Sequence, residues 1–188
     1  MNYDDIDAAR AEFYDRAAIT GSARYVRDHD LDPDTIEARA GCLGLVRGEM
    51  RPDRRWDFRA DGKALAVIEV FGSDDETTID LAAWSADGDP THVATMFGEA
   101  AVLGEARVEN PETYFGGKPL QVHGSALEWL AAGCLGVVVL DPGRAVDVLA
   151  EAPGRIAGRD HDHSRHLARL LRHYVDPRRV VAPLRRAA

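Results

Sequence analysis

Four side chains that could take part in chemistry follow predicted strands in the last third of the chain. His123 ends one short apolar run, Asp141 follows a second, and Asp160 and Asp162 follow a third. In a βαβαβ arrangement, ligand-binding groups gather beyond the carboxyl ends of the strands. Carboxylates on such an edge can hold Mg²⁺ through their oxygens, together with water and a substrate phosphate. The same aspartates also suit a turn at Asp141 and a helix cap at residues 160–164, so both interpretations stay open.

The segment 118–174 must position these side chains. It alternates short apolar runs with stretches of helical spacing, which predicts a βαβαβα order. The run Val137 to Leu140 has no polar alternation, as is typical of a parallel strand covered on both faces. We therefore expect it to be the central parallel strand, flanked by strands near Val122 and Ile156, with helices on both faces of the sheet.

The preceding part of the chain predicts helices first and then strands. The expected helices cover residues 4–16, residues 22–27 with Ser22 as N-cap, and residues 33–40. Strand periodicity follows at residues 64–71, 77–84, 92–97 and 101–103, which predicts a short antiparallel meander. The predicted class is thus α+β / α/β, with three parts: a helical lead-in with an arginine-rich loop (1–60), a small antiparallel β region (61–117), and an α/β unit with a parallel sheet and a basic C-terminal tail (118–188).

Composition limits the class of protein. The chain has 188 residues and a hydrophobic content of 45%, which is enough to build a core. No apolar run approaches the length of a membrane span, and the first residues are acidic where a signal peptide would be basic, so we expect a cytoplasmic protein without membrane contact. Cys42 and Cys134 have no metal-binding spacing and are expected to be reduced core residues.

The charge is unevenly distributed along the sequence. A formal net charge of −9 argues against a chain that holds nucleic acid by bulk electrostatics. Residues 159–188 nevertheless contain eight arginines and three acidic residues, and a second arginine-rich segment surrounds Trp56. Basic and aromatic residues together can hold a single strand, whereas the interleaved acids also suit an exposed, salt-bridged surface. The candidate nucleic-acid contacts are Arg51, Arg54, Arg55, Arg165, Arg169 and Arg172.

The order of these segments resembles the Toprim-containing primase-like proteins of phages and plasmids. Four stretches carry the resemblance: residues 18–27 (AITGSARYVR), residues 97–104 with their glycines, residues 120–130 (LQVHGSALEWL), and residues 156–168 (IAGRDHDHSRHLA). The resemblance implies a Toprim-like fold for residues 118–188 and a role in DNA replication, with single-stranded DNA or replication proteins as partners. It also implies Mg²⁺ as cofactor, with Asp141, Asp160 and Asp162 as its ligands and His123, Asp160 and Asp162 as the catalytic residues.

Two departures from the family pattern imply weakened catalysis. His123 stands where the family has a glutamate that acts as general acid or base, and Arg165 stands where it has glycine after the two aspartates. An imidazole can move a proton near pH 7 but adds no negative charge for a hard metal ion. The resemblance therefore implies a degenerate active site and weak binding of Mg²⁺.

Two alternatives stay open beside a catalytically impaired, nucleic-acid-associated protein. The same fold could serve as a non-catalytic protein-interaction module. The chain could also be a small metalloprotein, because histidines at positions 161, 163, 166 and 173 join Asp160 and Asp162 in offering nitrogen and oxygen ligands.

Overall fold

In the computed structural model, which describes residues 3–183, the chain begins with three helices. These are α1 (Tyr3–Arg16), α2 (Ile19–Asp28) and α3 (Pro33–Ala40). The bounds of α1 and α3 agree with the prediction, and the side chain of Asp32 caps α3 by accepting a hydrogen bond from the N–H of Asp34 at 3.2 Å. The predicted start of α2 at Ser22 is wrong. Its hydroxyl instead accepts a hydrogen bond from the N–H of Leu45 at 3.0 Å and so ties the helix to the first strand.

Five antiparallel strands form the first sheet. They are β1 (Leu43–Met50), β2 (Trp56–Phe58), β3 (Lys63–Phe71), β4 (Thr78–Ser85) and β5 (Val93–Thr95), in the order β2-β1-β3-β4-β5. The strands predicted at 64–71 and 77–84 are confirmed. Strands β1 and β2 lie within residues 1–60, where helices and a loop were expected. The glycines of β1 hid its pattern, and at Gly44 a Cβ atom would lie 2.7 Å from the ring of Phe13, so glycine is what lets α1 approach the strand.

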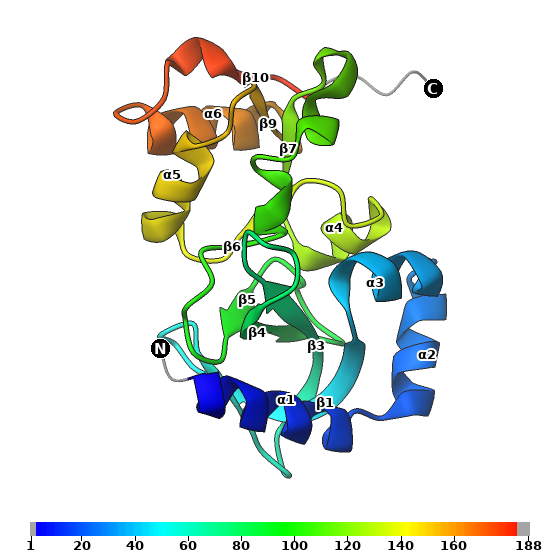
Figure 1. Cartoon of the computed structure of the whole chain (residues 1–188). Coiled ribbons are helices and arrows are strands. Elements are labelled where there is room, and N and C mark those ends of the chain that lie inside the picture. The colour runs from blue at the N-terminus through cyan, green and yellow to red at the C-terminus, as the bar shows by residue number, and fades with distance from the viewer. Residues whose placement is uncertain (1–2, 184–188) are drawn as a thin grey trace.

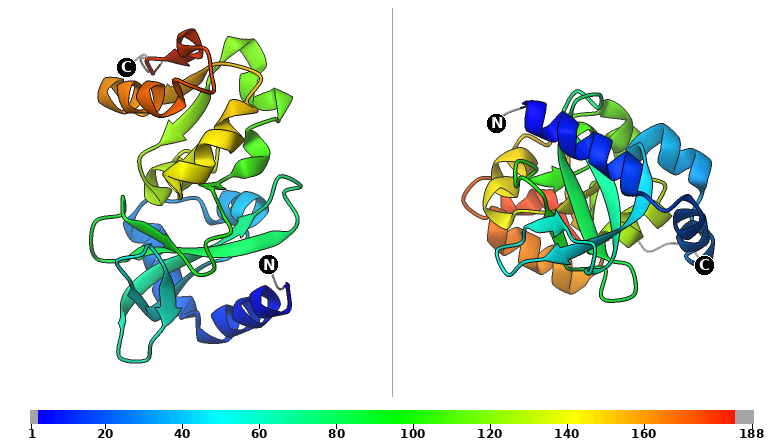
Figure 2. Two further views of the ribbon diagram at one scale, coloured as in Figure 1. Left: turned by 90° about the vertical axis from the view of Figure 1, so that its left-hand side faces the viewer. Right: turned by 90° about the horizontal axis from the view of Figure 1, so that it is seen from below.

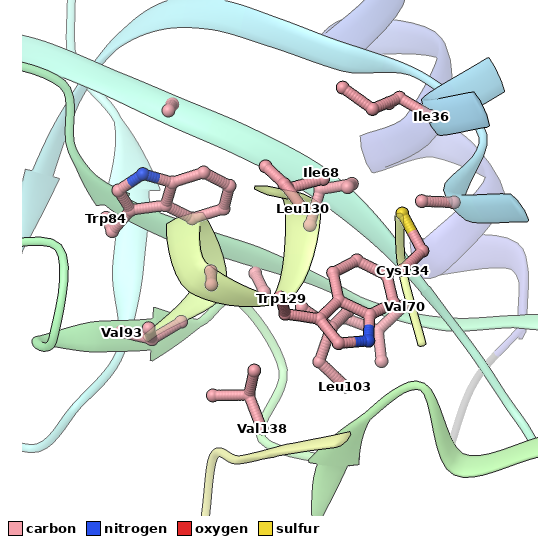
Figure 3. Close-up of a cluster of buried hydrophobic side chains, with 14 of the residues drawn as sticks. Ile36, Ile68, Val70, Trp84, Val93, Leu103, Trp129, Leu130, Cys134 and Val138 are labelled. Atoms are coloured by element: carbon pink, nitrogen blue, oxygen red, sulfur yellow. The ribbon is translucent and has the colours of Figure 1, made fainter. Parts of the chain in front are cut away.

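Side chains from both faces of this sheet are buried, which explains the continuous apolar run of β3. On one face Val67 packs with Phe13 and Trp56 beneath α1. On the other face Ile68 and Trp84 belong to a cluster that continues into the second half of the chain (Figure 3). Strand β3 therefore contributes side chains to both hydrophobic clusters, one on each face of the sheet, and the burial of both stabilises the fold.

The second sheet is mixed. Its strands are β6 (Val102–Leu103), β7 (Leu120–His123), β8 (Val137–Val139), β9 (Ile156–Gly158) and β10 (Val180–Val181), in the order β10-β9-β7-β8-β6. Strand β7 pairs in parallel with both β8 and β9, and β10 pairs in parallel with β9. Only β6 is antiparallel, against β8.

Two predictions about this sheet are wrong. The central strand is β7, and the run Val137 to Leu140 lies between β7 and the antiparallel β6. Residues 101–103, which were expected to continue the meander, supply β6 to the second sheet. The run of valines is apolar because Val137 and Val138 face two different hydrophobic cores. A strand can therefore be buried on both faces without being the central strand of its sheet.

Helices cover both faces of the second sheet, as predicted. Helix α4 (Ala126–Ala131) lies on the side of the first sheet, and α5 (Pro142–Ala150) and α6 (His161–Leu171) pack on the other face (Figures 1 and 2). Short 3₁₀ turns occupy Glu105–Arg107, Pro111–Gly117 and Pro177–Arg179. Trp129 and Leu130 of α4 join Ile68 and Trp84 in one core, so the two sheets are parts of one packed structure. No helix within residues 3–183 is long and apolar enough to cross a bilayer.

The two cysteines are free. Cys134 is buried in the core between the sheets, as expected, whereas Cys42 is only half-buried at the start of β1. Burial raises the pKa of both thiols, that of Cys134 to about 12, so neither is a thiolate near neutral pH.

Candidate functional site

The carboxyl ends of β7, β8 and β9 lie along one edge of the second sheet. His123 is the last residue of β7, Asp141 is the N-cap of α5 directly after β8, and Asp160 is the N-cap of α6 directly after β9. Because β7 lies between β8 and β9 and is parallel to both, the three side chains belong to the same edge.

The centre of this edge lies between β7 and β9. The connection from β7 runs through α4 on one face, and the connection from β9 runs through α6 on the other, which makes this the topological switch point of the sheet. Four residues meet there: Gly124, Glu128, Arg159 and His163. Sequence analysis did not nominate Glu128 or Arg159 for this site.

Arg159 and Glu128 close the switch point with an ion pair. The Arg159 Nη1 atom lies 3.2 Å from Glu128 Oε1, and Glu128 Oε2 accepts a hydrogen bond from the N–H of Gly124 at 2.8 Å. Glu128 is placed by its own helix, since its N–H bonds to the hydroxyl of the N-cap Ser125 at 3.1 Å. The sequence Ser125-Ala-Leu-Glu128 has the spacing of a capping box and was the one signal that could have pointed to this glutamate.

His163 completes the cluster as a neutral side chain. Its Nδ1 atom accepts a hydrogen bond from the backbone N–H of Arg159 at 3.2 Å. Burial lowers the pKa of His163, and the positive charge of Arg159 lowers it further. The imidazole therefore carries its proton on Nε2 at neutral pH.

His123 at the end of β7 contacts the backbone before β8. Its Nε2 atom lies 2.7 Å from the carbonyl oxygen of Leu135, in the turn before β8. Because a carbonyl oxygen only accepts, Nε2 is the protonated nitrogen in this contact. The bond fixes both the tautomer and the orientation of the ring.

The three aspartates are occupied by structural contacts. Asp141 accepts hydrogen bonds from the N–H groups of Gly143 and Arg144 at 2.8 and 3.4 Å, which caps α5. Asp160 accepts one from the N–H of His163 at 2.7 Å and another from Arg159 Nε at 3.0 Å. The N–H of His163 is the main cause of the lowered pKa of Asp160.

Asp162 lies in the first turn of α6 and forms an ion pair with Arg165, with 2.5 Å between Oδ1 and Nη2. The predicted proximity of Arg165 to the two-aspartate segment is thus present. Within the part of the chain that the structure describes, no three His, Cys, Asp or Glu side chains are grouped so that they could hold a metal ion. The capping interpretation accounts for Asp141 and Asp160, and an ion pair accounts for Asp162.

The six candidate arginines fall into two groups at different ends of the molecule. Arg51, Arg54 and Arg55 lie beside β2 in the lower half of Figure 1, and Arg165, Arg169 and Arg172 lie on or beside α6 in the upper half. They do not form one surface.

The first arginine group is largely engaged by its surroundings. Arg51 pairs with Asp53 and Asp57 at 3.8 and 3.5 Å, as expected for a salt-bridged surface. Arg55 packs over Gly98, and its Nη1 atom is buried without a hydrogen-bond partner. The exposed side chain of Arg54 forms no ion pair or hydrogen bond among residues 3–183, so within this group it is the arginine most open to a ligand.

The second group is exposed. Arg165, Arg169 and Arg172 follow one another at intervals of four and three residues, so they share one side of α6 and its last turn. Arg169 forms no ion pair or hydrogen bond with its side chain among residues 3–183, and Arg172 contacts only His173, at 2.8 Å. These side chains form the α6 arginine face.

One buried charged cluster was not predicted. Glu69 on β3 is 2% exposed and accepts hydrogen bonds from Arg10 Nε at 2.6 Å and from the Tyr14 hydroxyl at 2.8 Å. The hydroxyl of Thr78 and the N–H of Cys42 complete the set at 3.2 and 3.4 Å. With all its acceptor positions used, Glu69 joins α1 to the first sheet and raises the pKa of Tyr14, together with burial, to about 12.

Comparisons with models of protein families, with curated proteins and with solved structures found no match for this chain.

Proposed function

We propose that this chain is a nucleic-acid-associated protein with a Toprim-like α/β half whose catalytic centre is impaired. The observation that supports it best is the α6 arginine face. In a chain with a net charge of −9, three exposed arginines on one helix side are a local cationic surface.

The spacing of these arginines suits a phosphate backbone. Residues 165 to 172 extend over roughly 10 Å of a helix that rises 1.5 Å per residue. One strand of a DNA duplex carries about three phosphates over that length, at about 3.4 Å of helix axis each. Asp162 partly neutralises Arg165, so Arg169 and Arg172 are the stronger contacts of the three.

The carboxyl edge of the second sheet supports the impaired part of the proposal. Mg²⁺ is usually held by one or two carboxylates that remain open to water and to substrate phosphate. Here Asp160 bonds to Arg159 and caps the start of α6, and Asp162 forms an ion pair with Arg165. The donor set therefore fits Mg²⁺ poorly, and positioned negative charge for phosphoryl transfer is missing.

The test is binding to single-stranded DNA as a function of salt, followed by fluorescence anisotropy. The triple variant Arg165→Ala/Arg169→Ala/Arg172→Ala should reduce the slope of log K against log salt by about 2, since each phosphate contact on a single strand contributes about 0.7. The matched control removes three exposed arginines from the segment around β2, Arg51→Ala/Arg54→Ala/Arg59→Ala, and should leave the slope unchanged.

Two results would contradict the proposal. If the slope decreased more in the control than in the α6 variant, the segment around β2 would be the DNA contact instead. If the folded protein showed no salt-dependent binding to single-stranded DNA, the result would favour the alternative that this fold serves as a protein-interaction module.

The impaired centre has its own test. With Mg²⁺ present, we expect no robust primer synthesis on single-stranded DNA. Efficient synthesis that is abolished by Asp160→Ala would show that the centre is active. The exposed Asp89→Ala is the control for a nonspecific loss.

A further inference from the structure

A pocket of about 340 Å³ lies at the amino ends of β7 and β8, away from the strand edge described above. The C-terminal turn of α3, the segment after β6 and the two strand starts surround it. Three cationic side chains line it, each from a different part of the chain: Arg39, Arg107 and Lys118. Arg39 lies 68 positions before Arg107 in the sequence, so only the tertiary fold brings it to the same cavity as the other two.

Two of the three cations that line this pocket have no ion-pair partner within residues 3–183. Among its lining residues within 3–183, Glu112 is the one acidic side chain. Arg107 is held in place by Asp75, with 3.1 Å between Nη2 and Oδ2, and is only 15% exposed. The exposed side chains of Arg39 and Lys118 make no ion pair or hydrogen bond with any other residue that the structure describes.

Leu135 and Gly136 line the same pocket as the two guanidinium groups. The positive charges of Arg39 and Arg107 both oppose the increase that burial produces in the pKa of the Cys134 thiol. Cys134 lies just before Leu135 and Gly136, which form the floor of the pocket at the start of β8.

Neutral groups in the pocket add donors and an apolar wall. Asn110 accepts a hydrogen bond from the N–H of Glu112 at 2.9 Å through Oδ1, which leaves its amide hydrogens available. Pro119 and Leu135 contribute apolar surface, and Leu135 is 52% exposed. The pocket thus combines charged donors with a surface for an uncharged body.

We propose that this pocket binds a small phosphate ester. Arg39 and Lys118 form no ion pair within residues 3–183, whereas Arg107 is paired with Asp75, so the lining keeps a positive charge that favours an anion. Donors from three directions also suit a tetrahedral oxyanion, whereas a carboxylate is satisfied by one planar arginine fork. The volume exceeds that of phosphate alone, so the apolar wall has room for the ester group.

The proposal does not depend on the α6 arginine face. That face follows the carboxyl end of β9, whereas this pocket lies before β7 and β8. Substitutions at one place should therefore leave binding at the other unchanged.

Isothermal titration with three probes tests the pocket. Phenyl phosphate carries the dianion and an apolar body, inorganic phosphate lacks the body, and benzoate has the body with a single carboxylate. We expect saturable binding in the order phenyl phosphate, inorganic phosphate, benzoate. The double variant Arg39→Gln/Lys118→Gln should weaken phenyl phosphate on the order of a hundredfold, about tenfold for each charged hydrogen bond lost.

The control Arg24→Gln/Arg27→Gln removes the same charge from exposed positions on α2 and should bind as the unmodified protein does. Equal thermal midpoints of both double variants would confirm that the fold is intact. Absence of saturable binding by either phosphate probe at millimolar concentration would overturn the proposal. So would benzoate binding as tightly as phenyl phosphate, or an equal loss in the control variant.

Discussion

Asp80 anchors the segment that joins the two sheets. Its carboxylate is fully buried on β4, and each oxygen accepts two backbone hydrogen bonds. Oδ1 accepts from Leu81 and Phe97 at 2.8 and 2.9 Å, and Oδ2 accepts from Glu99 and Ala100 at 2.7 and 3.2 Å. Three of these donors belong to the loop between β5 and β6, so one side chain holds the connection between the sheets.

Replacement of Asp80 by Asn should be strongly destabilising although the shape is unchanged. The amide oxygen can replace one carboxylate oxygen, but the NH₂ group then faces two N–H donors. Each hydrogen bond to a charged group contributes about 1.5–3 kcal/mol, and two are lost. We therefore expect Asp80→Asn to lower the free energy of unfolding by about 3–5 kcal/mol, a large share of the roughly 5–15 kcal/mol typical of a domain.

Equilibrium unfolding in urea at pH 7.5 measures this change. Burial raises the pKa of Asp80, whereas the four N–H groups oppose that shift, and the assay pH is therefore set well above the usual range of an aspartate. Asp89 provides a matched control, because its Oδ1 alone accepts from both the N–H and the hydroxyl of Thr91, at 2.9 and 2.7 Å. An asparagine there keeps both bonds with its amide oxygen, and Asp89→Asn should cost less than about 1 kcal/mol.

A cost for Asp80→Asn equal to that of Asp89→Asn, with unchanged urea dependence, would refute this reasoning. It would mean that the loop between β5 and β6 does not depend on the four bonds. A reduced urea dependence would instead show that Asp80 holds the two sheets in one cooperative unit.

Three further predictions concern single contacts. Gly98→Ala should destabilise the protein by about 1–3 kcal/mol, because φ is +69° and a Cβ atom would meet the guanidinium of Arg55; in an Arg55→Ala background, urea unfolding should show a smaller cost. The lowered pKa of His163 means that this side chain binds a proton more readily in the unfolded chain than in the folded one, so stability should fall as the pH drops below about 6.5. In a profile of Tm against pH, His163→Gln should flatten this part of the curve. The control His166→Gln, at an exposed position, should leave the curve unchanged. Asp141→Ala should cost about 1 kcal/mol in urea unfolding through loss of the α5 cap, and Asp141→Asn should restore most of it.

Local patterns predicted the elements whose partners lie nearby in the sequence. Helix α3 was found because Pro33 and the capping Asp32 act within one turn. Strand β1 was missed because Gly44 and Gly48 break the apolar alternation, and the reason for Gly44 is a ring from another helix. A pattern of this kind reports burial but not the identity of the neighbour that causes it.

The position of the strands in the second sheet could not be derived in the same way. A run such as Val137 to Val139 indicates that both faces are covered, and any interior position of a sheet satisfies that condition. The pairing of β8 with β6 joins Val102 to Val139 and Leu103 to Val138, and it depends on how the loop held by Asp80 crosses between the sheets.

The candidate site also combines features that local sequence patterns predict with features that depend on tertiary contacts. Local sequence patterns predicted that His123, Asp141 and Asp160 lie at or just beyond the ends of their strands, and parallel pairing then places them on one edge. What these groups do there depends on tertiary contacts, because Arg159 meets Glu128 across 31 residues and takes up the centre of the edge. Arg39, Arg107 and Lys118 likewise converge only in the folded chain. Spacing along the sequence fixes neighbours within a helix turn or a strand, whereas charge pairing and cavities arise from packing between distant segments.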